Sequence, residues 1–277
     1  MPKFLFVDTC IYLDFYRIRT DLKNGFLAHL EAIKDSLITT DQVEMEYKKN
    51  RQDAILDGMQ ILKTPSGFTV PPLLRDDKSS TALETDIAKM TKCIKKLRQR
   101  FDAILKDPIR NDRVFQVMQR LFKKKQPIDL YRKSEQRYDL RELAKKRHLL
   151  GYPPRKKSDT SIGDAINWEW IVHVAKENNA DIIIVSRDGD YGINRDNSGY
   201  LNDWLKQEFR ERVNRQRSVE LYPLLSRALK EFKVQVSIEE EREEETLVKD
   251  PPLISTSVCS QDELQGSIEL PELLPAK

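Results

Sequence analysis

Short apolar runs alternate with amphipathic stretches in the first and last parts of the chain. Residues 3–8 and 181–186 each contain four consecutive apolar residues, a pattern typical of strands buried on both faces of a parallel sheet. Shorter runs predict strands at 37–40 and 219–221. Helical spacing of apolar positions predicts helices at 11–33, 41–63, 161–178, 200–213 and up to about 232. This alternation predicts parallel βαβ units.

The middle of the chain has a different pattern. Residues 79–106, 111–124 and 128–149 show helical periodicity without strand-like runs. Prolines and a glycine between residues 65 and 72 interrupt the pattern before them. We therefore interpret residues 66–157 as a helical insertion within a domain that spans 1–238. The predicted fold is a three-layer α/β/α sandwich with a central, mostly parallel sheet.

The net charge of +3 hides an uneven distribution. Residues 120–157 hold 14 Lys/Arg against 4 Asp/Glu, while residues 239–277 hold 11 Asp/Glu against 3 Lys/Arg. The basic stretch fits a surface for a polyanion, and a solvated helix face is the alternative. Tyr131, Tyr138 and Tyr152 lie among these basic residues, where they either stack bases or pack helices.

The acidic segment 239–277 contains too little apolar sequence to form a core, which predicts a disordered tail. Its role is left open between none, a contact with the basic insertion, and binding of a protein partner.

Other classes of protein fit the sequence poorly. The three cysteines form no CxxC pair, which favours a reducing, cytoplasmic environment and argues against a cysteine zinc site. The start resembles no signal peptide, and no apolar stretch reaches the roughly 18 residues of a membrane helix. The sequence contains no phosphate-binding glycine loop, and its three histidines lie near no serine elbow or cysteine nucleophile.

Acidic residues follow both of the long apolar runs. Asp8 ends the first, and Asp188 and Asp190 follow the second. The carboxyl ends of parallel strands meet at one edge of a sheet, where active sites of α/β proteins lie. Each acid alone is also explained as a helix cap or a turn residue. Together they would repel one another unless a cation neutralised them, which predicts a site for a hard metal ion.

Two further acids lie on predicted helices. Glu44 and Glu46 are separated by about 200° around the helix axis, so only one can face the sheet edge. Glu44 has a favourable spacing for a surface ion pair with Lys48, which leaves Glu46 as the candidate. Asp164 lies in the first turn of its helix, where the helix dipole favours an acid whatever its function.

Four motifs in this order resemble the PIN-domain nucleases: FVDT at 6–9, VEMEY at 43–47, IGDAINW at 162–168 and IVSRDGD at 184–190. They are most similar to a bacterial PIN-like branch with a long helical insertion, which shares KKNR at 48–51. The resemblance covers roughly residues 1–65 and 135–195.

The resemblance implies a nuclease that hydrolyses phosphodiester bonds with Mg²⁺ or Mn²⁺, on RNA before DNA. It assigns catalysis and metal binding to Asp8, Glu46, Asp164 and Asp188. Asp190 is expected as a further metal ligand. Contacts to the substrate are expected from Arg51, Lys145, Lys146 and Lys157. A catalytically inactive nucleic-acid-binding or scaffold protein is the alternative, and homo-oligomerisation and a toxin or antiphage role are left open.

Overall fold

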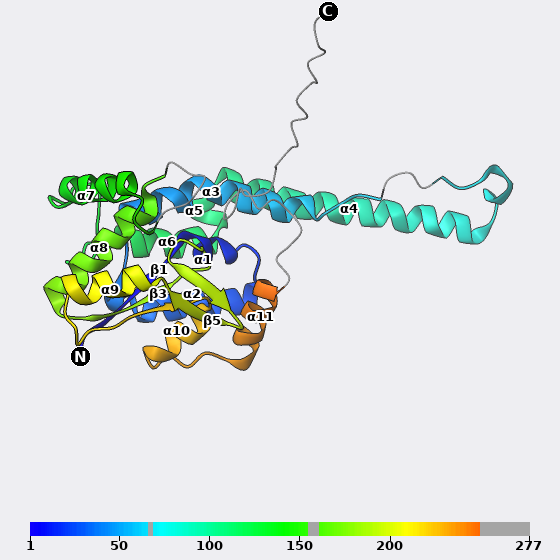
Figure 1. Ribbon diagram of the computed structural model, residues 1–277. Coiled ribbons are helices and arrows are strands. Elements are labelled where there is room, and N and C mark those ends of the chain that lie inside the picture. Colours follow the sequence, from blue (N-terminus) through cyan, green and yellow to red (C-terminus); the bar gives the residue numbers. More distant parts are fainter. Residues whose placement is uncertain (66–68, 155–160, 250–277) are drawn as a thin grey trace, which may run out of the picture.

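A parallel sheet lies at the centre of the molecule. The computed structural model describes residues 1–65, 69–154 and 161–249 (Figure 1). Within these ranges the central sheet has four strands in the order β2-β1-β3-β6, and every pair is parallel. The bounds are β1 (Lys3–Val7), β2 (Leu37–Ile38), β3 (Asp181–Val185) and β6 (Val219–Tyr222). The pairing of Val7 with Val185 makes β1 and β3 end side by side.

Helices cover this sheet, which confirms the predicted α/β architecture (Figure 1). Among them, α8 contacts β3, and α10 contacts β3 and β6. The apolar runs of β1 and β3 lie almost wholly in the core, since Leu5, Phe6, Ile182 and Ile184 are fully buried. The helices of this part are α1 (Thr9–Asp14), α2 (Thr20–Ala32), α3 (Asp41–Gln60), α8 (Gly163–Asn178), α9 (Asp203–Arg212) and α10 (Leu225–Glu231), with a short 3-10 turn at Lys34–Ser36.

The segment between α3 and α8 is helical, as the periodicity predicts. It contains a 3-10 turn (Pro72–Leu74), α4 (Lys78–Lys106), α5 (Pro108–Asn111), α6 (Arg113–Lys123) and α7 (Arg137–Leu150). Helix α4 extends away from the body of the molecule beside the end of α3 (Figure 1). In the part of the chain that the structure describes, no helix combines the length and the apolar character needed to cross a bilayer.

The helix predicted at 128–149 begins only at Arg137. The preceding residues run beside the end of β2, where Leu130 N donates to Thr39 O at 2.8 Å. Asp129 holds this path, because its carboxylate accepts hydrogen bonds from Thr39 and from Gln126 N. Tertiary hydrogen bonds therefore replace the first turns of the predicted helix.

A hairpin occupies the start of the helix predicted at 200–213. Strands β4 (Gly192–Arg195) and β5 (Ser198–Leu201) pair antiparallel. Asp196 and Asn197 link them with φ values of 50° and 59°, the backbone that tight two-residue hairpins require. Helix α9 begins after Asn202, whose side chain accepts a hydrogen bond from Trp204 N.

The predicted disorder of 239–277 is wrong for its first part. Helix α11 (Ile238–Lys249) packs against α2 and α10. Its Glu244 is only 3% exposed, and its carboxylate accepts hydrogen bonds from Leu225 N at 2.6 Å and Ser226 N at 2.8 Å, at the start of α10. An acidic helix is ordered here because its carboxylates bind backbone donors of the core. Residues 250–277 of the predicted tail lie outside the described residues.

Candidate metal centre

The predicted acids meet at the edge of the sheet where β1 and β3 end. Asp8 follows β1, and Asp188 and Asp190 follow β3. Asp164 is the second residue of α8, and Glu46 lies in α3. The parallel pairing of β1 with β3 brings the first three together because both strands end at the same level. The site therefore combines two strand ends with two helices.

Asp8 is held firmly by hydrogen-bond donors. Its side chain accepts from Thr9 N at 2.6 Å, which caps α1, and from Ser186 Oγ at 2.6 Å. Ser186 in turn accepts from Asp188 N at 3.0 Å, so the ends of β1 and β3 are linked. Burial raises the pKa of Asp8 to about 6, and the nearby Glu46 and Asp188 add to this rise while the two donors oppose it. Burial and the neighbouring acids thus disfavour the charged form of this carboxyl in the absence of a positive charge nearby.

Helix α3 presents Glu46 to the same edge. Its Oε2 accepts from Thr9 Oγ1 at 3.0 Å, and its Oε1 accepts from Gln42 Nε2 at 2.6 Å. Glu44, in contrast, pairs with Lys48 on the exposed side of the helix. The structure therefore places Glu46 beside Asp8 and Glu44 away from it, as the helical spacing indicates.

Gly163 allows α8 to begin directly against α3. A Cβ atom on Gly163 would lie 2.4 Å from Glu46 Oε1 and 2.7 Å from Gln42 Nε2. The absence of a side chain thus lets Glu46 lie beside Asp164, the next residue of the helix. The Gly-Asp pair in the sequence is a packing requirement of the site as well as a motif.

Asp164, Asp188 and Asp190 form the tightest group of acids. One carboxylate oxygen from each lies within 4.8 Å of the other two. The pKa of Asp164 is raised well above its usual range by burial, and next by Asp8, Glu46, Asp188 and Asp190. Mg²⁺ and Mn²⁺ prefer such oxygen ligands, and metal–oxygen distances of about 2.1 Å bring ligands on one ion within roughly 4 Å of each other. The donor set fits a divalent cation after a small closure.

Tyr191 is a residue of this site that the sequence does not reveal. Its ring is fully buried and contacts Phe6 with a centroid separation of 6.4 Å. Its hydroxyl has no hydrogen-bond partner among the described residues. Burial raises its pKa, and the charges of Asp164, Asp8, Glu46 and Asp188 raise it further, which places the hydroxyl near the acids. Its position directly after Asp190 is the only signal in the sequence, and there an aromatic residue resembles ordinary core.

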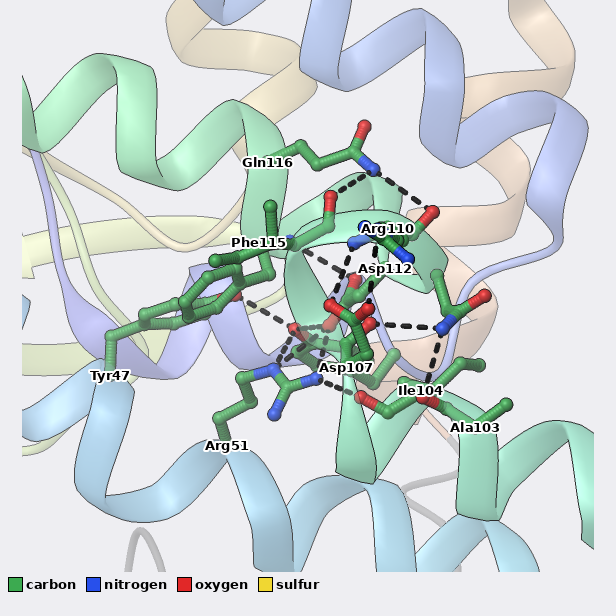
Figure 2. Close-up of polar contacts among 12 residues, drawn as sticks. Tyr47, Arg51, Ala103, Ile104, Asp107, Arg110, Asp112, Phe115 and Gln116 are labelled. Atoms are coloured by element: carbon green, nitrogen blue, oxygen red, sulfur yellow. Dashed lines mark hydrogen bonds and ion pairs between the residues drawn. The ribbon is translucent and has the colours of Figure 1, made fainter.

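Arg51 does not fit the predicted contact with substrate. Its side chain is 5% exposed and pairs with Asp112 at 2.7 Å (Figure 2). Its guanidinium also donates to Tyr16 Oη and Ile104 O, both at 3.0 Å. Arg51 follows the buried Tyr47 by one helical turn, so its burial could have been predicted from the helix period. It joins α3 to the insertion, since Asp112 caps α6.

The other predicted substrate contacts have different outcomes. Lys145 and Lys146 are exposed on α7, and Lys145 pairs with Glu142 at 2.7 Å. Lys157 lies outside the described residues. Arg147, a neighbour in the same basic run, is buried and pairs with Glu169 at 2.9 Å. The basic run therefore contributes both to the surface and to the interior.

One comparison with known proteins shows the family of this chain. No match was found among curated proteins or among solved structures. The family model of the PIN domain matches residues 5–191, which contain all five acids of the centre and the helical insertion. The order of the acids in the sequence, their convergence at one sheet edge and this match agree: the chain belongs to the PIN domain family.

Proposed function

We propose that the protein is a divalent-metal-dependent nuclease that hydrolyses phosphodiester bonds at the centre formed by Asp8, Glu46, Asp164, Asp188 and Asp190. The observation that carries this proposal is the convergence of these acids at one sheet edge, where carboxylate oxygens of Asp164, Asp188 and Asp190 lie within 4.8 Å of one another. The raised pKa values of Asp8 and Asp164 agree with this crowding of acids. Such a cluster is unfavourable by itself, because buried like charges repel, and it becomes favourable when a cation is bound. Membership of the PIN domain family supports a nuclease-type fold.

The residues of the centre have different proposed roles. Asp164, Asp188 and Asp190 are the proposed direct ligands, since their oxygens lie within 4.8 Å of one another. Asp8 and Glu46 border this group and complete its negative charge. A divalent cation bound there would polarise the scissile phosphate and lower the pKa of the attacking water. Ser186 and Thr9 orient Asp8 and Glu46 by hydrogen bonds. This arrangement requires no histidine as a base.

The proposed substrate is a nucleic acid, with RNA before DNA. The preference for RNA over DNA follows from the resemblance of the sequence to the family. The proposal that a phosphodiester bond is cleaved follows from the cation centre. Mg²⁺ and Mn²⁺ are the proposed ions, because the group that could hold a cation among the described residues, Asp164, Asp188 and Asp190, consists of carboxylates.

Cleavage of labelled RNA and DNA oligonucleotides in Mg²⁺, Mn²⁺ or EDTA tests the proposal. We expect cleavage only with metal, and Asp8→Asn or Asp164→Asn should reduce it by at least on the order of 10³-fold. Melting temperature measured with and without Mn²⁺ provides a readout that is independent of activity. The parent should be stabilised by the ion, and both variants should be stabilised less.

Glu46→Gln and Glu44→Gln form a matched pair on one helix. The first should strongly impair cleavage, and the second should leave it nearly unchanged because Glu44 only pairs with Lys48 at the surface. A parent that binds nucleic acid but shows no metal-dependent cleavage would support the inactive binding protein instead.

A further inference from the structure

We infer that Tyr152 and Trp204 form a platform on which a base of single-stranded nucleic acid stacks beside the metal centre. Their rings are stacked on each other, with centroids 5.2 Å apart and planes inclined by 29°. Both remain open to solvent, since Tyr152 is 41% and Trp204 is 47% exposed. This inference rests on the proposed function and specifies its substrate.

The two residues come from different parts of the chain. Tyr152 follows α7, and its N–H donates to Arg147 O at 3.0 Å. Gly151, between the helix and Tyr152, has φ 74°, which turns the chain sharply out of the helix. Trp204 lies in the first turn of α9. Their stacking therefore depends on how α7 and α9 are held together.

A buried network of ion pairs fixes the position of Tyr152 relative to α9. The guanidinium of Arg147 donates to Pro153 O, directly after Tyr152, and to Glu208 of α9. It also pairs with Glu169 of α8 at 2.9 Å. Arg212 of α9 completes the network by pairing with Glu169 at 2.7 Å and with Glu208 at 2.6 Å. The platform is thus formed before any ligand binds, which reduces the entropy cost of binding.

The platform lies close to the acids. Asn202 N donates to Tyr191 O at 2.9 Å, and Tyr191 follows Asp190. Trp204 is only two residues beyond Asn202, so its Cα lies within roughly 18 Å of that of Asp190. A nucleic acid strand at the centre can therefore reach the platform within a few nucleotides.

The chemistry of this surface fits an unpaired base. Large exposed aromatic faces offer stacking to any base, a contact that duplex bases cannot make because they already stack on one another. Helix α7, which leads to the platform, carries the exposed Lys145 and Lys146. Aromatic rings with nearby cations are the usual combination at sites for single strands.

Binding without cleavage tests the platform. The full chain in EDTA is titrated into labelled single-stranded RNA and DNA of about 12 nucleotides, and into a duplex of the same length, by fluorescence anisotropy. We expect Trp204→Ala and Tyr152→Ala each to raise the Kd for single strands by about 5- to 150-fold, with little effect on the duplex. Trp204→Phe should retain most of the affinity, because a stacking face remains.

Tyr138→Ala is the matched control, because Tyr138 is an exposed tyrosine of α7 without a stacking partner in the described residues. It should leave the Kd unchanged. Tryptophan emission provides a direct readout, since Trp168 and Trp170 are buried and only Trp204 is exposed. A single strand should quench this emission, and the quenching should disappear in Trp204→Phe.

The platform is refuted if Trp204→Ala and Tyr152→Ala both bind single strands within twofold of the parent, or if quenching persists in Trp204→Phe. Either result would indicate that this aromatic pair binds another kind of partner, such as a protein. The proposed function is tested separately by metal-dependent cleavage. Intact cleavage that Asp8→Asn abolishes, together with unchanged binding in the Trp204 variants, would reject the platform alone. Weakened binding in those variants, with no cleavage by the parent, would reject the nuclease alone.

Discussion

Helix α8 contributes to two groups of charges that differ in composition, Asp164 to the cluster of acids and Glu169 to a network of ion pairs with arginines. In the metal centre, Asp8 and Asp164 have raised pKa values because they are buried among other carboxylates. In the network below the platform, burial alone would raise the pKa of Glu208, but Arg147 and Arg212 outweigh it and lower the pKa. Arginines of the protein balance the acids of the network, whereas the centre gathers acids at one sheet edge.

This difference separates charges that hold the fold from charges that bind a ligand. A buried acid with arginine partners is satisfied, and losing one partner leaves an uncompensated charge. A buried cluster of acids is costly until a cation enters it. Variants at the two sites should therefore change stability in opposite directions.

The largest effect on stability should come from the network. Arg147→Met removes the partner shared by Glu169 and Glu208, so we expect the free energy of unfolding to fall by about 3–5 kcal/mol. Chemical denaturation measures this change. Arg110→Met is the control, because the Arg110–Asp107 pair is exposed and should contribute less than about 1 kcal/mol. Equal losses in the two variants would show that the buried network contributes no more to stability than an exposed ion pair.

The metal centre should make stability depend on pH in the absence of metal. Asp8 has a folded-state pKa of about 6 against a usual value of 3.8, so the folded state binds more protons between these values. Stability in EDTA should therefore fall as pH rises from about 4 to 6, by up to about 3 kcal/mol from this residue, and stay low above pH 6.

Denaturation at several pH values measures this slope. The fall in the free energy of unfolding with pH should be smaller in Asp8→Asn, because the amide cannot titrate. Mg²⁺ should restore the lost stability near pH 7. A parent whose stability in EDTA rises through this window, as for an ordinary paired acid, would contradict the electrostatic account of the centre.

A smaller effect should follow from the close approach of α8 to α3. Gly163→Ala should push the Glu46 carboxylate aside, because the new Cβ would lie 2.4 Å from it. Since the displaced atoms are the ends of flexible side chains, we expect little loss of stability but an approximately tenfold weaker affinity for Mn²⁺. Calorimetric titration of Mn²⁺ into the variant and the parent measures this affinity.

Gly58→Ala is the matched control for this change. It also lies in a helix, and its Cβ would make only an ordinary contact with Phe101 at 3.5 Å. It should leave metal affinity unchanged and stabilise the protein by up to about 1 kcal/mol. Similar metal affinities in both alanine variants would show that Gly163 does not position Glu46.

The smallest effect concerns the exposed lysines of α7. Lys145→Glu and Lys146→Glu should weaken binding of single strands modestly and reduce the log–log salt slope by roughly 0.7 for each lost phosphate contact. Lys89→Glu on α4 is the control, because Lys89 has an acidic partner three residues earlier, as Lys145 does. If all three variants give the same slope, α7 does not contact the substrate preferentially.

Much of the sheet and the acids could be predicted from the sequence. The apolar runs at 4–7 and 182–185 predict strands because only buried strands accommodate such runs, and acids after both then meet at one edge. The separation of Glu44 from Glu46 followed from the helix period alone. These inferences succeeded because each depends on local periodicity and on the general geometry of parallel sheets.

The tertiary structure decided which charges face solvent. Arg147 and Glu244 look like surface residues in the sequence, but each is buried against a partner on another helix, Glu169 of α8 for Arg147 and the start of α10 for Glu244. A charge run contains no information about such partners, because the energy depends on burial and on hydrogen bonds formed only after folding.

The sequence by itself determined the strands of the central sheet, the acids that meet at its edge and the family. Only the folded chain decided that Tyr191 is buried against Phe6, that α11 is ordered, and that Tyr152 meets Trp204. Periodicity is a local property of the chain, whereas the burial and pairing of single side chains arise from contacts between distant segments.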